Sequence, residues 1–238
     1  MKRIWITGGG SGIGAEMAKI YAEEGHNVFI SGRNKNKLEK VSPDVTIIPC
    51  DITNIKQVKK SIKKMQSLDL VILNAGVYLP GKSIETNILE YKKTMEVNYF
   101  GTLNCLLEII PIMKSKGGHI AVVSSLAGYR GLPNSSAYGS SKAALIHLCE
   151  SMKAELEDYP IKLQVINPGF VKTPMTKKNN FDMPYLIEPK LAAAKIIEGL
   201  KKDKFEIAFP KPLARRIKIL RLLPYNLYFY LIKKMLQK

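Results

Sequence analysis

Tyr138 and Lys142 lie four residues apart, in a segment where a helical pattern begins. On a helix this spacing places both side chains on one face, about one turn apart. A tyrosine hydroxyl has a pKa near ~10, and a nearby ammonium group stabilises the phenolate and lowers that pKa. The pair could exchange a proton with a carbonyl or alcohol oxygen near neutral pH, although such pairs also occur on helices without any function.

A serine pair precedes this tyrosine. An apolar, strand-like run ends in Ser124 and Ser125, and Ser125 stands thirteen residues before Tyr138. A serine hydroxyl at this place could hold a substrate oxygen by a hydrogen bond. Successive side chains of a strand point to opposite faces, so only one of the two serines is expected to reach the site.

A glycine-rich turn near the N-terminus indicates a binding site for an anion. The stretch 7–14, TGGGSGIG, directly follows the apolar run 3–6 and precedes a helical pattern that opens at Ala15. The first N–H groups of a helix have no internal partner, and the helix dipole favours negative charge there. Gly8, Gly12 and Gly14 would let the backbone approach a pyrophosphate, in the spacing T-G-x-x-x-G-x-G rather than G-x-G-x-x-G.

Seven apolar runs predict the strands that must position these groups. Helical patterns separate the runs, which span 3–6, 28–31, 45–50, 69–73, 119–124, 162–167 and 205–209. This alternation predicts an α/β fold of Rossmann type: a doubly wound, seven-stranded parallel sheet with helices on both faces. Ligands bind such sheets beyond the carboxyl ends of the strands, where the sequence places Gly8, Arg33, Asp51, Asn74, Ser125 and Pro168.

The motifs resemble those of the short-chain dehydrogenases/reductases, over about residues 2–210. The resemblance implies one Rossmann-type catalytic domain over 1–210 and the strand order 3-2-1-4-5-6-7. It also implies an NAD(P)-dependent oxidoreductase that interconverts a carbonyl and an alcohol by hydride transfer. Its spacing selects Ser125 over Ser124. The motifs that carry it are the glycine turn, Asn74-Ala75-Gly76 and Pro168-Gly169, with Asp51 and the implied catalytic residues Asn98, Ser125, Tyr138 and Lys142.

Further roles around the cofactor follow from the same resemblance. Asn98 would anchor a water that links Lys142 to solvent, or else serve as a polar group in helix packing. Asp51 would accept a hydrogen bond from the adenine amino group, although Asp51 or Thr53 could instead cap the next helix. The implied cofactor-binding residues are Gly8, Ser11, Gly12, Ile13, Gly14, Arg33, Asp51, Ile52, Asn74, Ala75, Gly76, Tyr138, Lys142, Pro168, Gly169, Val171 and Thr173.

The end of the second predicted strand favours NADP(H) over NAD(H). NAD sites of this type place a carboxylate there to hold the ribose hydroxyls, but this chain has Gly32-Arg33-Asn34. A guanidinium group can bind a 2′-phosphate through two hydrogen bonds, and Ser11 and Ser31 could add hydroxyl donors. The alternative is that Arg33 stacks on the adenine of NAD.

Composition bears on partners and location. The 238-residue chain has a formal net charge of +17, and part of this excess lies on one face of the helical pattern 55–65, as in a solvated surface. Without a reading motif we expect no nucleic-acid partner. The scattered cysteines Cys50, Cys105 and Cys149 indicate reduced core thiols, no metal site and a cytoplasmic location. The first strand begins at once, which leaves no room for a signal peptide.

The segment 211–238 is a basic, amphipathic C-terminal extension. It carries eight basic residues and no acidic one. Leu213–Leu223 predicts a helix that Pro224 ends, and an aromatic-rich segment follows. The apolar run 222–232 is too short to span a bilayer. We expect the extension to lie on an anionic membrane surface, which would make the protein peripherally membrane-associated, or to pack on a partner subunit or over the substrate mouth.

The segment 174–188 has the length and composition of the family's substrate lid. Its side chains would line a mainly apolar cavity: Met175, Phe181, Met183 and Tyr185. We therefore expect an NADP(H)-dependent oxidoreductase for a hydrophobic small-molecule carbonyl or alcohol, with Tyr138 as general acid/base. The alternative is a non-catalytic, dinucleotide-sensing or membrane-associated interaction protein on the same fold. The resemblance also implies a homodimer or homotetramer through the helices at 90–114 and 137–157.

Overall fold

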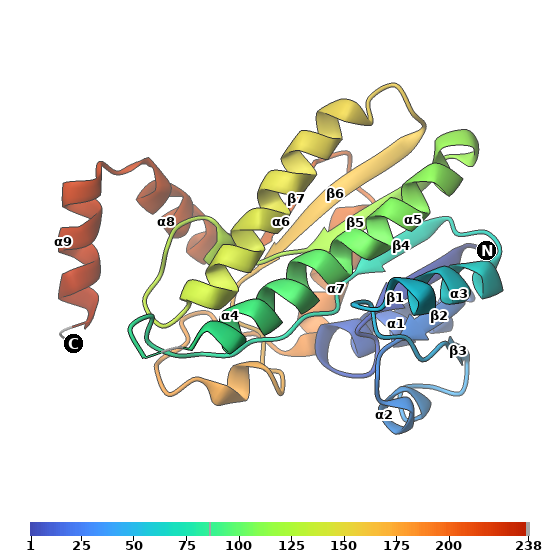
Figure 1. The fold of residues 1–238 in the computed structure, drawn as a ribbon, viewed down its shortest axis with the longest axis horizontal. Coiled ribbons are helices and arrows are strands. Elements are labelled where there is room, and N and C mark those ends of the chain that lie inside the picture. Colours follow the sequence, from blue (N-terminus) through green and yellow to red (C-terminus); the bar gives the residue numbers. More distant parts are fainter. Residues whose placement is uncertain (86, 237–238) are drawn as a thin grey trace.

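A twisted parallel sheet with helices on both faces forms the body of the molecule (Figure 1). The computed structural model describes residues 1–85 and 87–236. Every neighbouring pair of strands is parallel, in the order β3-β2-β1-β4-β5-β6-β7, which confirms the predicted fold class and strand order. The strands are β1 (Arg3–Thr7), β2 (Asn27–Ser31), β3 (Val45–Ile47), β4 (Leu70–Leu73), β5 (Gly118–Val123), β6 (Ile161–Pro168) and β7 (Glu206–Phe209).

Two hydrophobic clusters join the helices to the sheet. One face is covered by α3 (Ile55–Met65), α5 (Gly101–Lys116) and α6 (Ser136–Glu155), which pack around Trp5 and Val122. The other is covered by α1 (Gly12–Glu23), α2 (Lys35–Glu39) and α7 (Pro189–Leu200), which pack around Ile6 and Ile166. Strands buried on both faces explain why the apolar runs are continuous rather than alternating.

Two elements differ from the sequence expectation. The third strand is assigned only to Ile47 rather than to 50, although the N–H groups of Ile48 and Cys50 still donate to β2, to the carbonyl oxygens of Ile30 and Gly32. The long helical pattern around Asn98 is interrupted: α4 (Ile88–Met95) passes through a π-helical turn, Glu96–Phe100, into α5. A π-bulge of this kind shifts side chains around the helix axis and is frequent at functional sites.

The C-terminal extension forms two helices, of which the first was predicted. These are α8 (Lys211–Leu222) and α9 (Tyr225–Leu236), with Pro224 between them. Leu213, Ala214 and Ile217 of α8 are buried in the core cluster of the α6 face. The division at residue 210 stays a prediction. Of the helices that the structure describes, none is both long enough and apolar enough to cross a bilayer.

Candidate active site

Tyr138 and Ser125 face each other at the carboxyl end of β5. Tyr138 lies in the first turn of α6, and Ser125 begins the 3₁₀ turn Leu126–Gly128 that follows β5. The Ser125 side chain is within hydrogen-bonding reach of the Tyr138 side chain. It also accepts a hydrogen bond from the Ala127 N–H at 3.1 Å, which fixes its orientation. Two groups that could hold one substrate oxygen therefore point at the same place.

Ser124 has a different role. Its side chain is buried, and its hydroxyl donates to the Lys142 carbonyl oxygen at 2.7 Å. The alternation of side chains along β5 thus turns Ser125, not Ser124, toward Tyr138.

Lys142 lies beneath the tyrosine ring. Its side chain is only 3% exposed, and Nζ donates to the Val123 carbonyl oxygen at 2.8 Å. The ammonium nitrogen is 5.7 Å from the centroid of the Tyr138 ring. Burial lowers the pKa of Lys142 to about 8, because the charged form loses its hydration.

The pKa of Tyr138 moves in the direction opposite to our expectation. Burial raises it to about 12, only partly offset by the Ser125 hydrogen bond. In this structure burial therefore outweighs the predicted lowering by Lys142, whose Nζ donates to a backbone carbonyl. The consequence is that the Tyr138 hydroxyl keeps its proton at neutral pH.

Asn98 links three elements from within the π-helical turn. Its Oδ1 accepts from the Val77 N–H at 2.7 Å, and its Nδ2 donates to the Val77 carbonyl at 3.0 Å and to Ser141 Oγ at 2.9 Å. A Cβ added to Gly76 would lie 3.2 Å from Asn98 Oδ1 and 3.7 Å from Lys142 Nζ. Asn98 is thus close to the lysine and also packs on α6, so the geometry accommodates both predicted roles.

The glycine turn forms a close-fitting cradle. Gly8 and Gly12 have φ values of +67° and +56°, and a Cβ on Gly14 would come within 2.5 Å of the Gly8 carbonyl oxygen. Asn74 Nδ2 donates to the Thr7 carbonyl oxygen at 3.1 Å and ties the end of β4 to this turn. The Thr7 hydroxyl accepts from the N–H groups of Asn74 and Ala75.

Ser11 stands at the N-terminus of α1 and leaves the first turn of that helix open. Its side chain is exposed and caps no N–H of the helix. Ile13 and Gly14 follow in the first turn, whose N–H groups have no intrahelical acceptor. With the glycines that remove side-chain bulk, these residues fit the pyrophosphate of a dinucleotide.

The loop after β6 closes over the same turn. A Cβ on Gly12 would be 3.1 Å from Thr173 Cγ2, so two predicted cofactor residues that are distant in sequence are neighbours. Val171 is buried and forms a bridge to Ile187. A Cβ on Gly169 would lie 2.9 Å from Leu213 Cδ2, so this end of the loop packs against α8.

The predicted cap of α3 by Asp51 or Thr53 is wrong. Asp51 does not cap α3: its Oδ1 accepts from the Thr53 N–H and hydroxyl, at 3.0 and 2.8 Å. The cap is Asn54, whose side chain accepts from two N–H groups of the first helical turn. Ile52 is buried against Gly101, and its carbonyl oxygen accepts from Asn104 Nδ2 at 3.0 Å.

A second expectation, that Ser31 at the end of β2 could donate to a phosphate, is also wrong. Ser31 is fully buried and accepts from Trp5 Nε1 at 2.9 Å, so it cannot serve as a surface hydroxyl donor to a phosphate. Arg33 is exposed. Sequence analysis missed Lys37: a Cβ on Gly10 would be 3.4 Å from Lys37 Cβ, which places this lysine beside the glycine turn. The signal was its position four residues after Arg33.

Comparison with known proteins decides the family. A family model described as short chain dehydrogenase matches residues 2–184. The chain belongs to this family. It is therefore an NAD(P)-dependent oxidoreductase that acts on CH–OH groups.

The relatives of this dehydrogenase span most of its length. An uncharacterized oxidoreductase of Myxococcus xanthus is 33% identical, over 94% of this chain and 93% of its own. A 3-ketodihydrosphingosine reductase of Dictyostelium discoideum is 32% identical, over 89% of this chain and 75% of its own. The crystal structure of a short-chain dehydrogenase from Burkholderia cenocepacia in complex with NADP has a TM-score of 0.88 at 29% identity, with 97% of each chain covered.

Tyr78, in the loop after β4, lies against Tyr138, a contact that sequence analysis did not predict. Its ring meets that of Tyr138 edge-on, with centroids 5.0 Å apart. Its hydroxyl donates to Asn179 Oδ1 at 2.8 Å, and Lys178 Nζ donates to its carbonyl oxygen at 3.2 Å. The segment predicted as a lid thus contacts the loop after β4 directly above the catalytic tyrosine candidate. Further along it, Phe181 is partly exposed.

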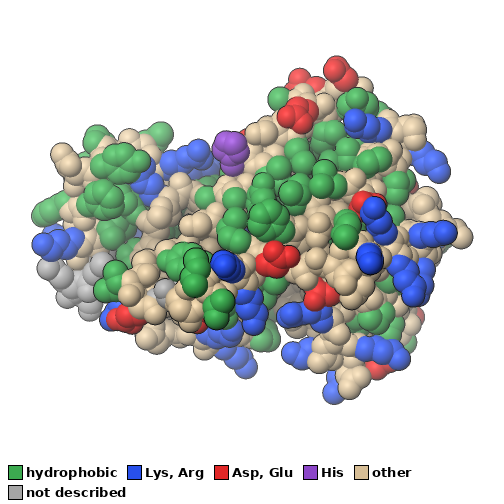
Figure 2. Space-filling view, in the orientation of Figure 1, with side chains coloured by type: hydrophobic (Ala, Val, Ile, Leu, Met, Phe, Trp, Pro, Cys, Tyr) green, Lys and Arg blue, Asp and Glu red, His purple; other side chains and the backbone are tan. Residues whose placement is uncertain are grey.

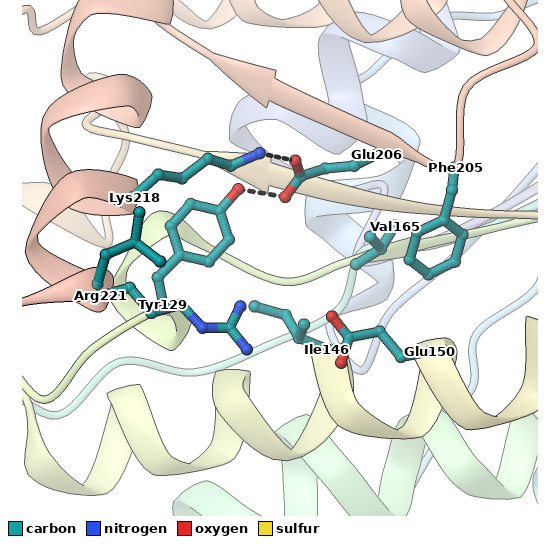
Figure 3. Close-up of a pocket in the computed structure, with 9 residues that line it drawn as sticks. Tyr129, Ile146, Glu150, Val165, Phe205, Glu206, Lys218 and Arg221 are labelled. Carbon is teal, nitrogen blue, oxygen red and sulfur yellow. Dashed lines mark hydrogen bonds and ion pairs between the residues drawn. The ribbon is translucent and has the colours of Figure 1, made fainter.

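A cavity of about 430 Å³ lies between α6, α8 and the strands β6 and β7 (Figure 3). Tyr129, four residues after Ser125, lies between Lys218 and Arg221, and its hydroxyl donates a hydrogen bond to the Glu206 carboxylate. Lys218 pairs with the same carboxylate, and Asn167 Nδ2 donates to it at 2.8 Å. The Glu206 carboxylate therefore joins α8, β6 and the loop that carries Ser125.

Glu206→Gln should lower the free energy of unfolding by about 2 kcal/mol at neutral pH, because it removes a charged acceptor from three partners. Burial acts to raise the pKa of Glu206, but the hydrogen bonds from Lys218, Tyr129 and Asn167 hold it below its ordinary value. A lowered folded-state pKa gives stability that is present above the unfolded-state value and is lost as the pH falls. Urea unfolding should show the difference shrink below about pH 4.

The matched control is Glu198→Gln, which breaks the exposed Glu198–Lys202 pair on α7. We expect no measurable change from it. An equal loss in both variants would contradict the special role of Glu206.

Proposed function

We propose that this dehydrogenase reduces a carbonyl group with NADPH and that Tyr138 donates the proton. The observation that carries the proposal is the meeting of Ser125 and Tyr138 above the buried Lys142. In support, the Tyr138 hydroxyl is protonated at neutral pH, which suits donation to a carbonyl oxygen better than removal of a proton from an alcohol.

Each of the four residues has its own role in this reaction. The Ser125 hydroxyl holds the substrate oxygen by a hydrogen bond and directs it at Tyr138. The Tyr138 hydroxyl gives its proton to that oxygen, and the Lys142 ammonium stabilises the phenolate that remains. Asn98 holds the loop at Val77 and the start of α6 at Ser141, which keeps Lys142 in place. The bound nicotinamide supplies the hydride to the carbonyl carbon.

Charge at the end of β2 supports NADP over NAD. Arg33 is exposed there and Lys37 lies beside the glycine turn, while residues 31–34 contain no carboxylate. Two cationic groups at this place suit a 2′-phosphate, and a guanidinium binds phosphate through two hydrogen bonds. In further support, the structure from Burkholderia cenocepacia was solved with NADP, whereas one from Burkholderia phymatum, at 20% identity, was solved with NAD.

The substrate we propose is apolar, of the kind of a long-chain ketone. Tyr78 forms an aromatic wall against Tyr138, and Phe181 packs edge-on against Phe170 with ring centroids 5.9 Å apart. The name of the Dictyostelium relative, a reductase of a long-chain 3-ketone, points the same way. NADPH oxidation should be followed with a series of ketones and aldehydes of increasing chain length. Turnover that rises with chain length supports the proposal, and turnover only of short polar carbonyls would contradict it.

We also propose a homodimer or homotetramer through the helices at 90–114 and 137–157. Hydrophobic side chains gather over α5 and α6 on one face of the molecule (Figure 2). Phe100, Leu107 and Ile112 are between 38% and 56% exposed there.

The three cysteines are buried and unpaired, in keeping with a cytoplasmic enzyme. A purely dinucleotide-sensing role is not favoured, because the serine, tyrosine and lysine are all present and converge.

The rate of reduction should fall above about pH 8. Burial sets the pKa of Lys142 at about 8, so the ammonium charge that stabilises the Tyr138 phenolate is lost as the pH rises through that value. The profile of kcat/KM with NADPH between pH 6 and 10 measures this. Lys142→Arg keeps its charge over this pH range. Its remaining activity should therefore not fall above about pH 8. A wild-type profile that stays flat to pH 10 would contradict the role given to Lys142.

A further inference from the structure

Helix α9 presents a second apolar face, which the fold does not cover. Tyr228 and Ile232 are buried against the rest of the chain. The other side carries large hydrophobic side chains that are between 46% and 68% exposed: Tyr225, Leu227, Phe229 and Tyr230. An exposed apolar patch of this kind marks an interaction surface rather than an ordinary solvated helix.

Contacts with the loop 130–131 hold this face outward. The Tyr228 hydroxyl donates to the Gly131 carbonyl oxygen. The Arg130 guanidinium lies 4.7 and 4.4 Å from the ring centroids of Tyr225 and Tyr228, and it donates to the Leu223 carbonyl oxygen at 3.4 Å. The orientation of α9 is therefore set by specific interactions, and its outer side chains stay in solvent.

The charge around this face has one sign. After Glu206 the chain contains no acidic residue and eight basic ones. Lys233 and Lys234 are exposed at the end of α9. A second copy of the chain would bring two positive surfaces together, so the charge argues against self-association here. It is complementary to an anionic partner.

The lid segment 174–188 contacts this end of the molecule. Arg216 of α8 stands 5.5 Å from the ring centroid of Tyr185 in the lid segment. Helices α8 and α9 form one end of the long axis, opposite α3 (Figure 1), and that end shows hydrophobic and basic side chains intermingled (Figure 2).

We propose that α9 and the end of α8 dock on an anionic lipid bilayer. The twelve residues of α9 extend about 18 Å, too short to cross a hydrocarbon core of about 30 Å, so the helix would lie along the surface. Tyrosine and phenylalanine suit the headgroup region, and the lysines suit anionic headgroups. This docking goes beyond the proposed reduction and would bring the lid segment, which contacts α8, near the bilayer.

Sedimentation of the full chain with vesicles tests the proposal. Lys233→Gln/Lys234→Gln should bind phosphatidylserine-containing vesicles at least tenfold more weakly than the wild type, because each basic residue near such a surface contributes about fivefold. Lys63→Gln/Lys64→Gln removes the same charge from α3, at the opposite end, and should bind like the wild type. Neutral phosphatidylcholine vesicles should bind little protein, and high salt should release it from the anionic ones.

A spectroscopic variant reports the depth of α9. The chain has one tryptophan, Trp5, which is fully buried. In Tyr230→Trp the new indole should shift its emission to the blue on anionic vesicles and be quenched by brominated lipid. Vesicle binding needs no turnover, so these results are independent of the proposed activity.

Three results would overturn the docking proposal. One is wild-type protein that stays in the supernatant with anionic vesicles at low salt. Another is an equal loss of binding in both double-lysine variants, which would mean that net charge alone drives adsorption. The third is a dimer, detected by light scattering, that Phe229→Ser/Tyr230→Ser abolishes, which would assign the face to a second copy.

Discussion

Tyr138→Phe should lower turnover by at least ~10²-fold while NADPH still binds. The substitution keeps the ring that packs edge-on against Tyr78 and removes only the hydroxyl that faces Ser125. The substrate oxygen would then lack its proton donor, whereas the glycine turn, where we expect the dinucleotide to bind, is untouched. Steady-state NADPH oxidation measures turnover, and titration of NADPH fluorescence measures binding.

Tyr78→Phe is the matched control. It removes a hydroxyl from the neighbouring ring and breaks the bond to Asn179, yet leaves the donor in place. We expect it to change KM more than kcat, because it acts on the lid segment. If Tyr138→Phe turns over any substrate at a near-normal rate, Tyr138 is not the proton donor.

Gly32→Asp/Arg33→Gln should reverse the cofactor preference. The 2′-phosphate of NADPH would lose a cationic partner and meet a carboxylate, whereas the ribose hydroxyls of NADH would gain an acceptor. Gly32 can accept the new side chain, because a Cβ there would lie 3.5 Å from Leu38 Cδ2, an ordinary contact. We expect at least a ~10²-fold change in the ratio of the two dissociation constants, as for loss of two charge-assisted hydrogen bonds.

Lys63→Gln/Lys64→Gln, which removes two positive charges from the exposed side of α3, matches the change of net charge in the double substitution and controls for it. It should leave both dissociation constants unchanged. If wild-type protein binds NADH as tightly as NADPH, the argument from Arg33 and Lys37 fails.

The sheet and its helices could be predicted because their signals are local. Continuous apolar runs, the glycine turn and Pro224 each determine the backbone within a few residues, and the structure confirms the parallel sheet and the helix that ends before Pro224. The register of β1 against β2 is not local. It pairs Trp5 with Phe29 and brings the indole N–H to the Ser31 hydroxyl, which no spacing in the sequence indicates.

The site could be predicted as a set of residues but not as a set of interactions. Asn54 caps α3, because the Asp51 carboxylate already accepts a hydrogen bond from the Thr53 hydroxyl in the turn before the helix. Tyr78 meets Asn179, a residue about a hundred positions away, only because the lid folds back over β4. The pKa of Tyr138 depends on burial, which the spacing to Lys142 does not reveal.

Transfer of deuterium from NADPH to a carbonyl carbon tests the central claim most directly. Full-length enzyme would be incubated with NADPH that carries deuterium at both C4 positions of the nicotinamide and with a long-chain 3-ketone, and the product analysed by mass spectrometry. The account predicts an alcohol that carries the deuterium on the former carbonyl carbon, formed by the wild type and at least ~10²-fold more slowly by Tyr138→Phe. An alcohol without deuterium, or equal rates for the two proteins, would contradict it.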